Sequence, residues 1–218
     1  MRSLTPSAQK ICAIAVEQFA ELGYDASSLN DIAAAAGMRK PSLYAHFTGK
    51  DDLFQVVYER ALQTEHEHLE ACFAEQVPAS ELPGQRFAER LHERYQASAH
   101  LRFMLRTAFF PPSELRPVIC AGFEAYLARL GELFAQALRG YAPGLDDQQQ
   151  RLYGDAYLGI VDSLNVELIY AGAGAFARRL AALWWMFGES LRGASPLPQS
   201  GSVGAGLPRD AVSQTTAK

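Results

Sequence analysis

Apolar residues recur along almost the whole sequence at steps of three and four, and no run alternates between apolar and polar residues as a half-buried strand does. Residues 5–22 give the first clear case. Thr5 followed by Pro6 is a favourable helix start, because the hydroxyl can cap the helix and proline suits its first turn. Gly23 is a natural stop. The predicted apolar face comprises Ile11, Ile14, Ala15, Phe19 and Leu22. The pattern predicts an all-α protein.

Glycine, proline and capping residues divide this pattern into about nine segments. The last residues, 194–218, are rich in serine, glycine, proline and alanine, and have little apolar surface to bury. We predict that they form a disordered tail. The predicted helices span residues 5–22, 28–36, 40–46, 50–76, 85–98, 101–110, 113–138, 147–170 and 176–191.

The average charge of the chain is acidic, with a net charge of −4 and a pI of about 5.7. That average argues against a protein that binds nucleic acid through its whole surface. However, Arg39, Lys40 and Lys50 follow one another closely and form a local basic patch. A small basic region attached to an acidic body is therefore compatible with the composition.

The three cysteines are widely spaced, which predicts no disulfide framework and fits a reducing compartment. Charged residues interrupt the N-terminal region and the most apolar late region, so we expect neither a signal peptide nor a membrane span. These features predict a cytoplasmic protein without a membrane partner.

Residues 28–36 and 40–46 form two short predicted helices joined by a turn that contains Gly37. This arrangement is typical of a helix-turn-helix, in which the second helix enters the DNA major groove. The second helix is too short to be stable alone. We therefore expect Leu43 and Phe47 to anchor it in the core while its other face meets DNA.

Each outward residue has an expected role. Arg39 is the candidate for reading a base, because its guanidinium matches guanine. Lys40 and Ser42 are expected at bases or phosphates, and Tyr44 and Lys50 at phosphates. His46 either donates to a phosphate or locks the turn. The predicted DNA-binding set is Ser28, Arg39, Lys40, Pro41, Ser42, Tyr44, His46 and Lys50.

The residues from Ser28 to Gly37, from Met38 to Phe47 and from Lys50 to Phe54 together resemble the DNA-binding domain of the tetracycline-repressor (TetR) family. Two positions depart from the family pattern. Arg39 stands where serine is frequent, and Pro41 stands where glycine or a small residue is frequent. We expect both departures to change the operator sequence that is recognised.

The resemblance implies a homodimer of nine or so helices whose C-terminal part binds a small ligand. It implies that this effector releases the protein from a near-palindromic DNA operator, and that the protein represses transcription. It implies neither catalysis nor a cofactor. The expected division is a helix-turn-helix DNA-binding domain at 1–50, a helical effector-binding and dimerisation domain at 51–193, and the tail at 194–218.

The last two predicted helices carry apolar stripes, and in the resembling family these helices form the dimer interface. The two tryptophans favour this interpretation, since large aromatic residues often anchor interfaces. Burial within one subunit is the alternative. The predicted interface comprises Leu164, Leu168, Phe176, Leu180, Leu183, Trp184, Phe187 and Leu191, with Leu158 and Ile160 nearby.

A group of aromatic and polar residues in the C-terminal part is the candidate effector pocket. Ordinary core packing is the alternative for its aromatic members, and intersubunit hydrogen bonds are the alternative for its polar members. Arg102 and Arg106 either meet an anionic ligand or are solvated. The candidate pocket comprises Phe103, Met104, Phe109, Phe110, Tyr126, Tyr157, Asp162 and Asn165.

Other functions remain open from the sequence. His68 and Cys72 are one helical turn apart, a spacing that suits two ligands of one metal, so a metal- or redox-responsive regulator is the alternative. His92 or His100 would supply further ligands. An enzyme or a helical adaptor is a further alternative. However, no phosphate-binding glycine loop or catalytic serine motif is present, and neither class explains the basic patch.

Overall fold

The computed structural model describes residues 3–193, which form nine α-helices and one 3₁₀ turn without any strand. The all-α prediction is therefore confirmed for this part of the chain. No helix in this range is long and apolar enough to cross a membrane. The predicted tail, 194–218, lies outside the described residues.

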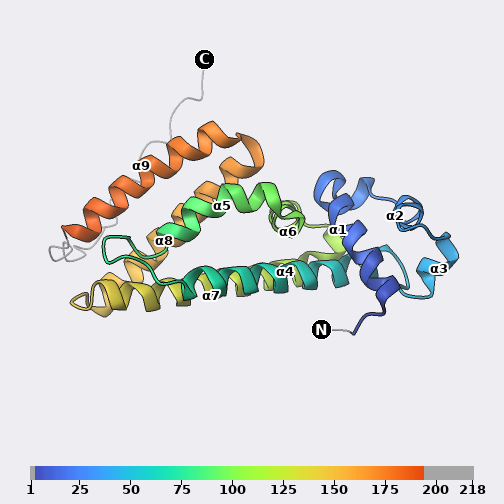
Figure 1. The fold of residues 1–218 in the computed structure, drawn as a ribbon, viewed down its shortest axis with the longest axis horizontal. Helices are drawn as coiled ribbons and strands as arrows, with labels where there is room; N and C mark the ends of the chain where they lie inside the picture. The colour runs from blue at the N-terminus through green and yellow to red at the C-terminus, as the bar shows by residue number, and fades with distance from the viewer. Residues whose placement is uncertain (1–2, 194–218) are drawn as a thin grey trace, which may run out of the picture.

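The first three helices are α1 (Pro6–Ala26), α2 (Leu29–Ala35) and α3 (Lys40–Tyr44), and we refer to them as the head. Figure 1 shows the head at one end of an elongated molecule. The Thr5 hydroxyl accepts a hydrogen bond from the Ala8 amide at 3.3 Å, so the predicted cap is present. Gly23 interrupts α1 with a φ of 79°, although one more turn follows to Ala26.

The other helices, α4 to α9, are referred to as the body. Their bounds are α4 Lys50–Ala74, α5 Gln85–Ala97, α6 Ala99–Phe109, α7 Arg116–Tyr141, α8 Asp147–Tyr170 and α9 Ala173–Arg192. Pro117 falls in the first turn of α7, directly after a 3₁₀ turn at Ser113–Leu115, and so does not kink the helix. α4 and α7 run side by side along the molecule, as Figure 1 shows.

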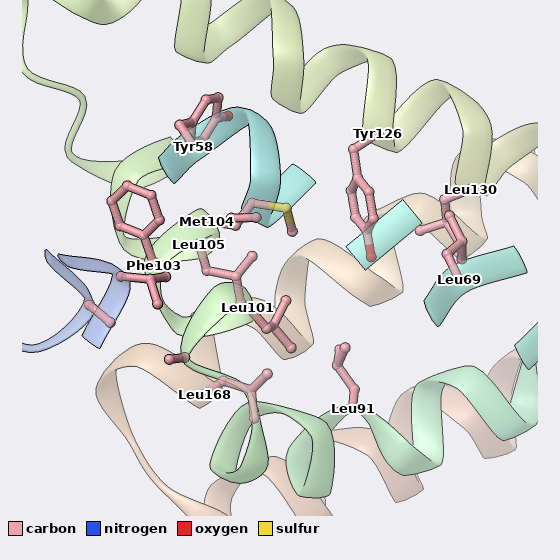
Figure 2. Packing of buried hydrophobic residues seen from close by; sticks show 14 of the residues in the cluster. Tyr58, Leu69, Leu91, Leu101, Phe103, Met104, Leu105, Tyr126, Leu130 and Leu168 are labelled. Carbon is pink, nitrogen blue, oxygen red and sulfur yellow. The ribbon is translucent and has the colours of Figure 1, made fainter. Parts of the chain in front are cut away.

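The core continues from the head into the body. In Figure 2, Phe103 and Met104 of α6 lie among apolar side chains from α4 and α7, and both are fully buried. Phe103 joins the two parts, because its ring lies 5.7 Å from that of Phe19 in α1 and 5.0 Å from that of Phe54 in α4. Leu22 departs from the prediction, because it is half-exposed rather than part of the apolar face.

A buried polar network fixes the junction between α5 and α6. The side chain of Glu65 in α4 is 1% exposed and accepts two hydrogen bonds from Arg94, at 2.7 and 3.1 Å. It also accepts one from the Ser98 hydroxyl at 2.8 Å. Ser98 in turn caps α6 by accepting from the Leu101 amide. A buried carboxylate bonded in this way holds α4, α5 and α6 in one arrangement.

Candidate nucleic-acid interface

The short helix α3 is held by two side chains and presents the rest to solvent. Leu43 is 0% exposed and Phe47, just beyond the helix, is 1% exposed. Most of the predicted DNA-binding residues lie together on the outer side of this helix and its first turn. Arg39, Lys40, Pro41, Ser42 and Tyr44 are all exposed. This surface can enter a groove with two cations, a hydroxyl and a phenol.

The start of α3 explains how the helix tolerates its departures from the family pattern. Arg39 occupies the N-cap position in extended backbone, and its side chain makes no capping hydrogen bond. Pro41 stands in the first turn, where its fixed φ suits the helix and its missing N–H is not needed. The guanidinium of Arg39 therefore takes no part in starting the helix.

The turn between α2 and α3 depends on Gly37, whose φ of 72° lies in the left-handed region. The amides of Gly37 and Met38 donate to the carbonyls of Ala34 and Ala33 at 2.9 and 3.0 Å, which closes the end of α2. A Cβ placed on Gly37 would lie 3.9 Å from Nζ of Lys10. This brings an exposed cation of α1 beside the turn, a candidate contact that the sequence motif did not single out.

The predicted phosphate contacts at the edges of the surface are already engaged within the chain. The Ser28 hydroxyl caps α2 by accepting from the Asn30 amide at 3.2 Å. Lys50 donates to the Asp25 carbonyl at 3.2 Å, and its Nζ lies 4.3 Å from the centroid of the Tyr24 ring. His46 is half-buried, with its ring 6.4 Å from that of Phe47. Phosphate roles for these three residues stay predictions.

Tyr24 completes the cluster around Lys50. Its hydroxyl donates to the Asp51 carboxylate, and its ring packs on that of Phe54 at 5.2 Å. Partial burial and the bond to Asp51 raise the pKa of Tyr24 to about 12. The cluster ties the last turn of α1 to the first turn of α4, and so helps to set the position of the head relative to the body.

The structure does not gather the candidate effector residues in one cavity. Phe103, Met104, Tyr126 and Tyr157 are buried in the core, as Figure 2 shows for the first three. Tyr157 stacks on Phe134 with ring centroids 4.1 Å apart and donates to the Gly84 carbonyl at 3.1 Å.

The remaining candidate effector residues lie elsewhere. Phe109 and Asp162 line a surface pocket of about 370 Å³, where burial raises the pKa of the Asp162 carboxyl. Phe110 is 63% exposed, and Asn165 is buried on α8.

Most of the predicted dimer-interface residues are packed inside the chain. Leu164, Leu168, Phe176, Phe187 and Leu191 are buried, and Leu180, Leu183 and Trp184 are half-buried. The stripe faces neighbouring helices of the same chain, as the contact between the rings of Phe187 and Phe134 illustrates. The large apolar residues that α8 and α9 expose are different ones: Leu152, Val166, Tyr170, Trp185 and Met186.

Two surface grooves border α9. The α8–α9 groove, of about 380 Å³, is lined by small residues such as Ala156, Gly159 and Ser163 together with Leu183 and Met186. The α5–α9 groove, of about 830 Å³, lies between the polar residues of α5 and the aromatic residues of α9. The two grooves share no lining residue, so they occupy different faces of α9.

The predicted pair for a metal site is in contact, with Nε2 of His68 and Sγ of Cys72 3.5 Å apart. Burial lowers the pKa of His68 and raises the pKa of the Cys72 thiol. Within residues 3–193, no group of three or more histidine, cysteine or carboxylate side chains is placed to hold a metal. The contact therefore supplies at most two ligands.

Comparison with known proteins matches the head to one family. Residues 11–57 fit the model of the bacterial regulatory proteins of the tetR family. The chain is 46% identical over 46 residues to the HTH-type transcriptional repressor ComR of Escherichia coli, which is 21% of this chain and 22% of that protein. It is 39% identical over 51 residues to the HTH-type transcriptional regulator AcrR of Shigella flexneri, which is 23% of this chain and 24% of that protein. The matched stretches thus span less than a quarter of these relatives.

Solved structures resemble the whole fold. The fatty acid degradation regulator FadR from Bacillus halodurans superposes with a TM-score of 0.63 at 21% identity, covering 87% of this chain and 96% of that chain. A TetR-like transcriptional regulator from Rhodococcus superposes with a TM-score of 0.62 at 21% identity, covering 88% and 100%. At this identity the likeness establishes the arrangement of helices in the body and nothing about what the body binds.

Proposed function

We propose that this chain is a ligand-responsive repressor that binds a near-palindromic operator as a homodimer, because residues 11–57 match the model of the bacterial regulatory proteins of the tetR family. Its chemistry is binding rather than catalysis, and its place of action is the cytoplasm, where the DNA is. The observation that carries the proposal is the exposed surface of α3, on which Arg39, Lys40, Ser42 and Tyr44 lie together above a fully buried anchor.

The proposed division of labour follows the helices. The head reads DNA, with Arg39 at a base edge and Lys40 and Tyr44 at base edges or phosphates. The body, α4 to α9, dimerises and receives the effector. Two heads related by a two-fold axis read equivalent half-sites in successive major grooves, about 34–36 Å apart.

The α8–α9 groove supports the proposed dimer. It is apolar, and Ala156, Gly159 and Ser163 leave room for a helix of a second copy to approach closely. Val166 is 41% exposed and Met186 is 62% exposed on the same two helices, so a partner would cover apolar surface that one chain leaves in water. The groove includes Leu183 and Phe187 from the predicted stripe and adds residues that the stripe did not indicate, such as Ala156, Gly159 and Met186.

The experiment that tests the proposal selects ligands for the purified protein from a pool of random DNA duplexes. Fluorescence anisotropy then measures the affinity of the enriched duplex over a series of salt concentrations. We expect a near-palindromic motif and an affinity that falls steeply with salt, because cations on the protein displace counterions. Lys40→Ala should reduce the salt slope by about one, whereas Arg151→Ala, an exposed change on α8, should leave it unchanged.

Failure to enrich any motif, with equal and weak binding to all duplexes, would contradict the DNA-binding proposal. An enriched motif without two-fold symmetry would contradict the dimer alone. The metal-responsive alternative predicts instead that a divalent transition metal is needed for DNA binding, and that His68→Gln abolishes this metal-dependent binding.

A further inference from the structure

The α5–α9 groove has two chemically different walls. The wall from α9 is apolar and consists of Phe176, Leu180, Trp184 and Trp185, between alanines that keep the groove open. The wall from α5 is polar, with Gln85, Glu89 and His92 spaced so that they share one face of the helix. The volume of about 830 Å³ lies within the range of small-molecule sites. The groove therefore suits a molecule with a large apolar body and a polar or charged side.

The charge of the groove is negative at its α5 wall. Glu89 is exposed and accepts a hydrogen bond from the Gln85 side-chain amide at 2.7 Å. Across the described residues, no lysine or arginine forms an ion pair with Glu89, whereas Arg86 and Arg90 on the same helix are both paired with Glu75. The arginine that lines the groove, Arg192, is paired with Glu189 at 2.7 Å. Of the acidic and basic residues that line the groove within residues 3–193, Glu89 has no ion-pair partner, whereas Arg192 has one.

Aromatic faces and a free carboxylate together favour one class of ligand. Tryptophan is the side chain that attracts an organic cation most strongly, through the negative face of its ring. A carboxylate adds a charge of the right sign, and the apolar wall gains from covering hydrocarbon or aryl surface. A hydrophobic anion would meet the same apolar wall but would be repelled by Glu89.

We propose that the α5–α9 groove binds a hydrophobic organic cation, with its aryl or alkyl body against Trp184 and Trp185 and its positive charge facing Glu89. The site is the effector site of the proposed repressor, so its regulatory meaning, though not the binding itself, rests on that function. A second copy of the chain is the other possible occupant. The α8–α9 groove on another face of α9 is the better surface for that copy, because it is lined by small residues.

Two non-covalent contacts of one side chain join α5, which forms one wall of the groove, to the head. Arg102 of α6 donates to the Gln96 carbonyl at the end of α5 at 3.0 Å. The same guanidinium pairs with Glu17 of α1 at 3.1 Å. A ligand that shifts α5 would therefore strain a contact that reaches α1, and through it the helix-turn-helix.

The two tryptophans of the chain both line this groove, so intrinsic fluorescence reports on it directly. The probe is tetraphenylphosphonium, and the matched control is tetraphenylborate, which has nearly the same size and shape and the opposite charge. We expect saturable quenching by the phosphonium and at least tenfold weaker binding of the borate. Equal affinity for the two ions, or no saturable quenching by either, would overturn the proposal.

Variants of single residues test whether the carboxylate of Glu89 is the group that faces the cation. Glu89→Gln should weaken phosphonium binding about threefold to fivefold, the effect of one exposed ion pair. Glu93→Gln, which makes the same charge change one turn further along α5 outside the groove, should leave binding unchanged. Trp185→Ala removes an exposed side chain, keeps Trp184 as the reporter, and should also weaken binding. Equal effects of the two glutamate variants would refute the assignment to Glu89.

The binding assay and the DNA assay separate the two proposals. Phosphonium that binds the groove and releases the selected duplex supports both. Binding without release supports the site and contradicts its effector role. Release of DNA by a molecule that does not quench the tryptophans supports the repressor and contradicts this site. Sedimentation with and without phosphonium tests whether a second copy of the chain occupies the groove instead. If phosphonium displaced such a copy, the measured molecular mass would fall by half.

Discussion

Single residues determine which bases the head is proposed to recognise and which substitutions the body can accommodate. Arg39 gives the clearest test. Its side chain is exposed and makes no capping bond, so it is available to a base. Arg39→Ala should cost about 1–3 kcal/mol of discrimination at one base pair, because a bidentate bond to guanine is lost. Anisotropy against single-base operator variants measures this. Tyr44→Phe should instead weaken binding to every variant alike, and a base preference that survives Arg39→Ala would refute the role.

Gly84 is fixed by two constraints that only the structure reveals. Its φ is 72°, and a Cβ there would meet the Tyr157 ring at 2.5 Å. Gly84→Ala should therefore lower the free energy of unfolding by about 2–4 kcal/mol, combining backbone strain with overpacking. Thermal or urea denaturation measures it. Gly140→Ala is the control, because nothing lies within 4 Å of that position. A Gly84 variant as stable as the control would contradict the packing.

For single residues, the sequence predicts which side chains are buried better than it predicts which residues or ligands they contact. Leu43 and Phe47 were predicted as anchors and are buried. The aromatic residues of the candidate effector pocket could not be placed, because an apolar residue that packs in the core looks the same in a sequence as one that lines a cavity. Lys10 was missed because its closeness to the turn at Gly37 is a tertiary contact between α1 and that turn, which the local motif does not show.

Among the elements, α6 holds the head to the body. Arg102 and Glu17 form an ion pair between α6 and α1 at 3.1 Å, with Arg102 half-buried and Glu17 exposed. A double-mutant cycle with alanine at both positions should give a coupling energy of about 0.3–1 kcal/mol that falls with salt. Urea denaturation measures the four proteins. The cycle of Arg102 with Glu21 should give no coupling, because only the backbone carbonyl of Glu21 is used, by Arg106.

The histidines of α4 and α6 should make stability depend on pH. Burial lowers the pKa of His66, His68 and His100 below the usual value for histidine of about 6.5, so the unfolded chain takes up protons first as pH falls. Their contribution is present above 6.5 and is lost below it. We expect the free energy of unfolding to fall between about pH 7.5 and pH 5.5. Replacing all three by glutamine should flatten this dependence, and an unchanged slope would contradict it.

Helix boundaries followed closely from local chemistry, because each depends on a few neighbouring residues. Thr5 caps the helix that it was predicted to cap, and Ser28 caps α2 at the predicted start of the second helix. Which helices pack against one another could not be predicted from local chemistry. The stripe on α9 was correctly identified as apolar, yet periodicity does not say whether the neighbour of that stripe is α8 of the same chain or a second copy.

For the whole molecule, the all-α fold class and the N-terminal helix-turn-helix could be predicted, because a helix-turn-helix is encoded by a short dense motif. The α5–α9 groove, which is the proposed effector site, could not be predicted, because it is formed by residues about ninety positions apart that no local pattern connects. The division into domains at 50/51 stays a prediction. It falls at the start of α4, an unbroken helix that packs against α1 of the head as well as α6 and α7 of the body.

The dimer is the property of the whole molecule that mutation tests most directly. Met186 is 62% exposed and lines the α8–α9 groove, so Met186→Glu would bury a charge in the proposed interface. Sedimentation equilibrium at micromolar concentration should show a dimer for the unmodified protein and a monomer for this variant. Val118→Glu on α7, where the valine is 49% exposed, is the control and should remain a dimer. The monomeric variant should also lose affinity for a palindrome but keep it for a half-site, since each head reads one half-site alone. A Met186→Glu protein that stays dimeric would move the interface away from this groove.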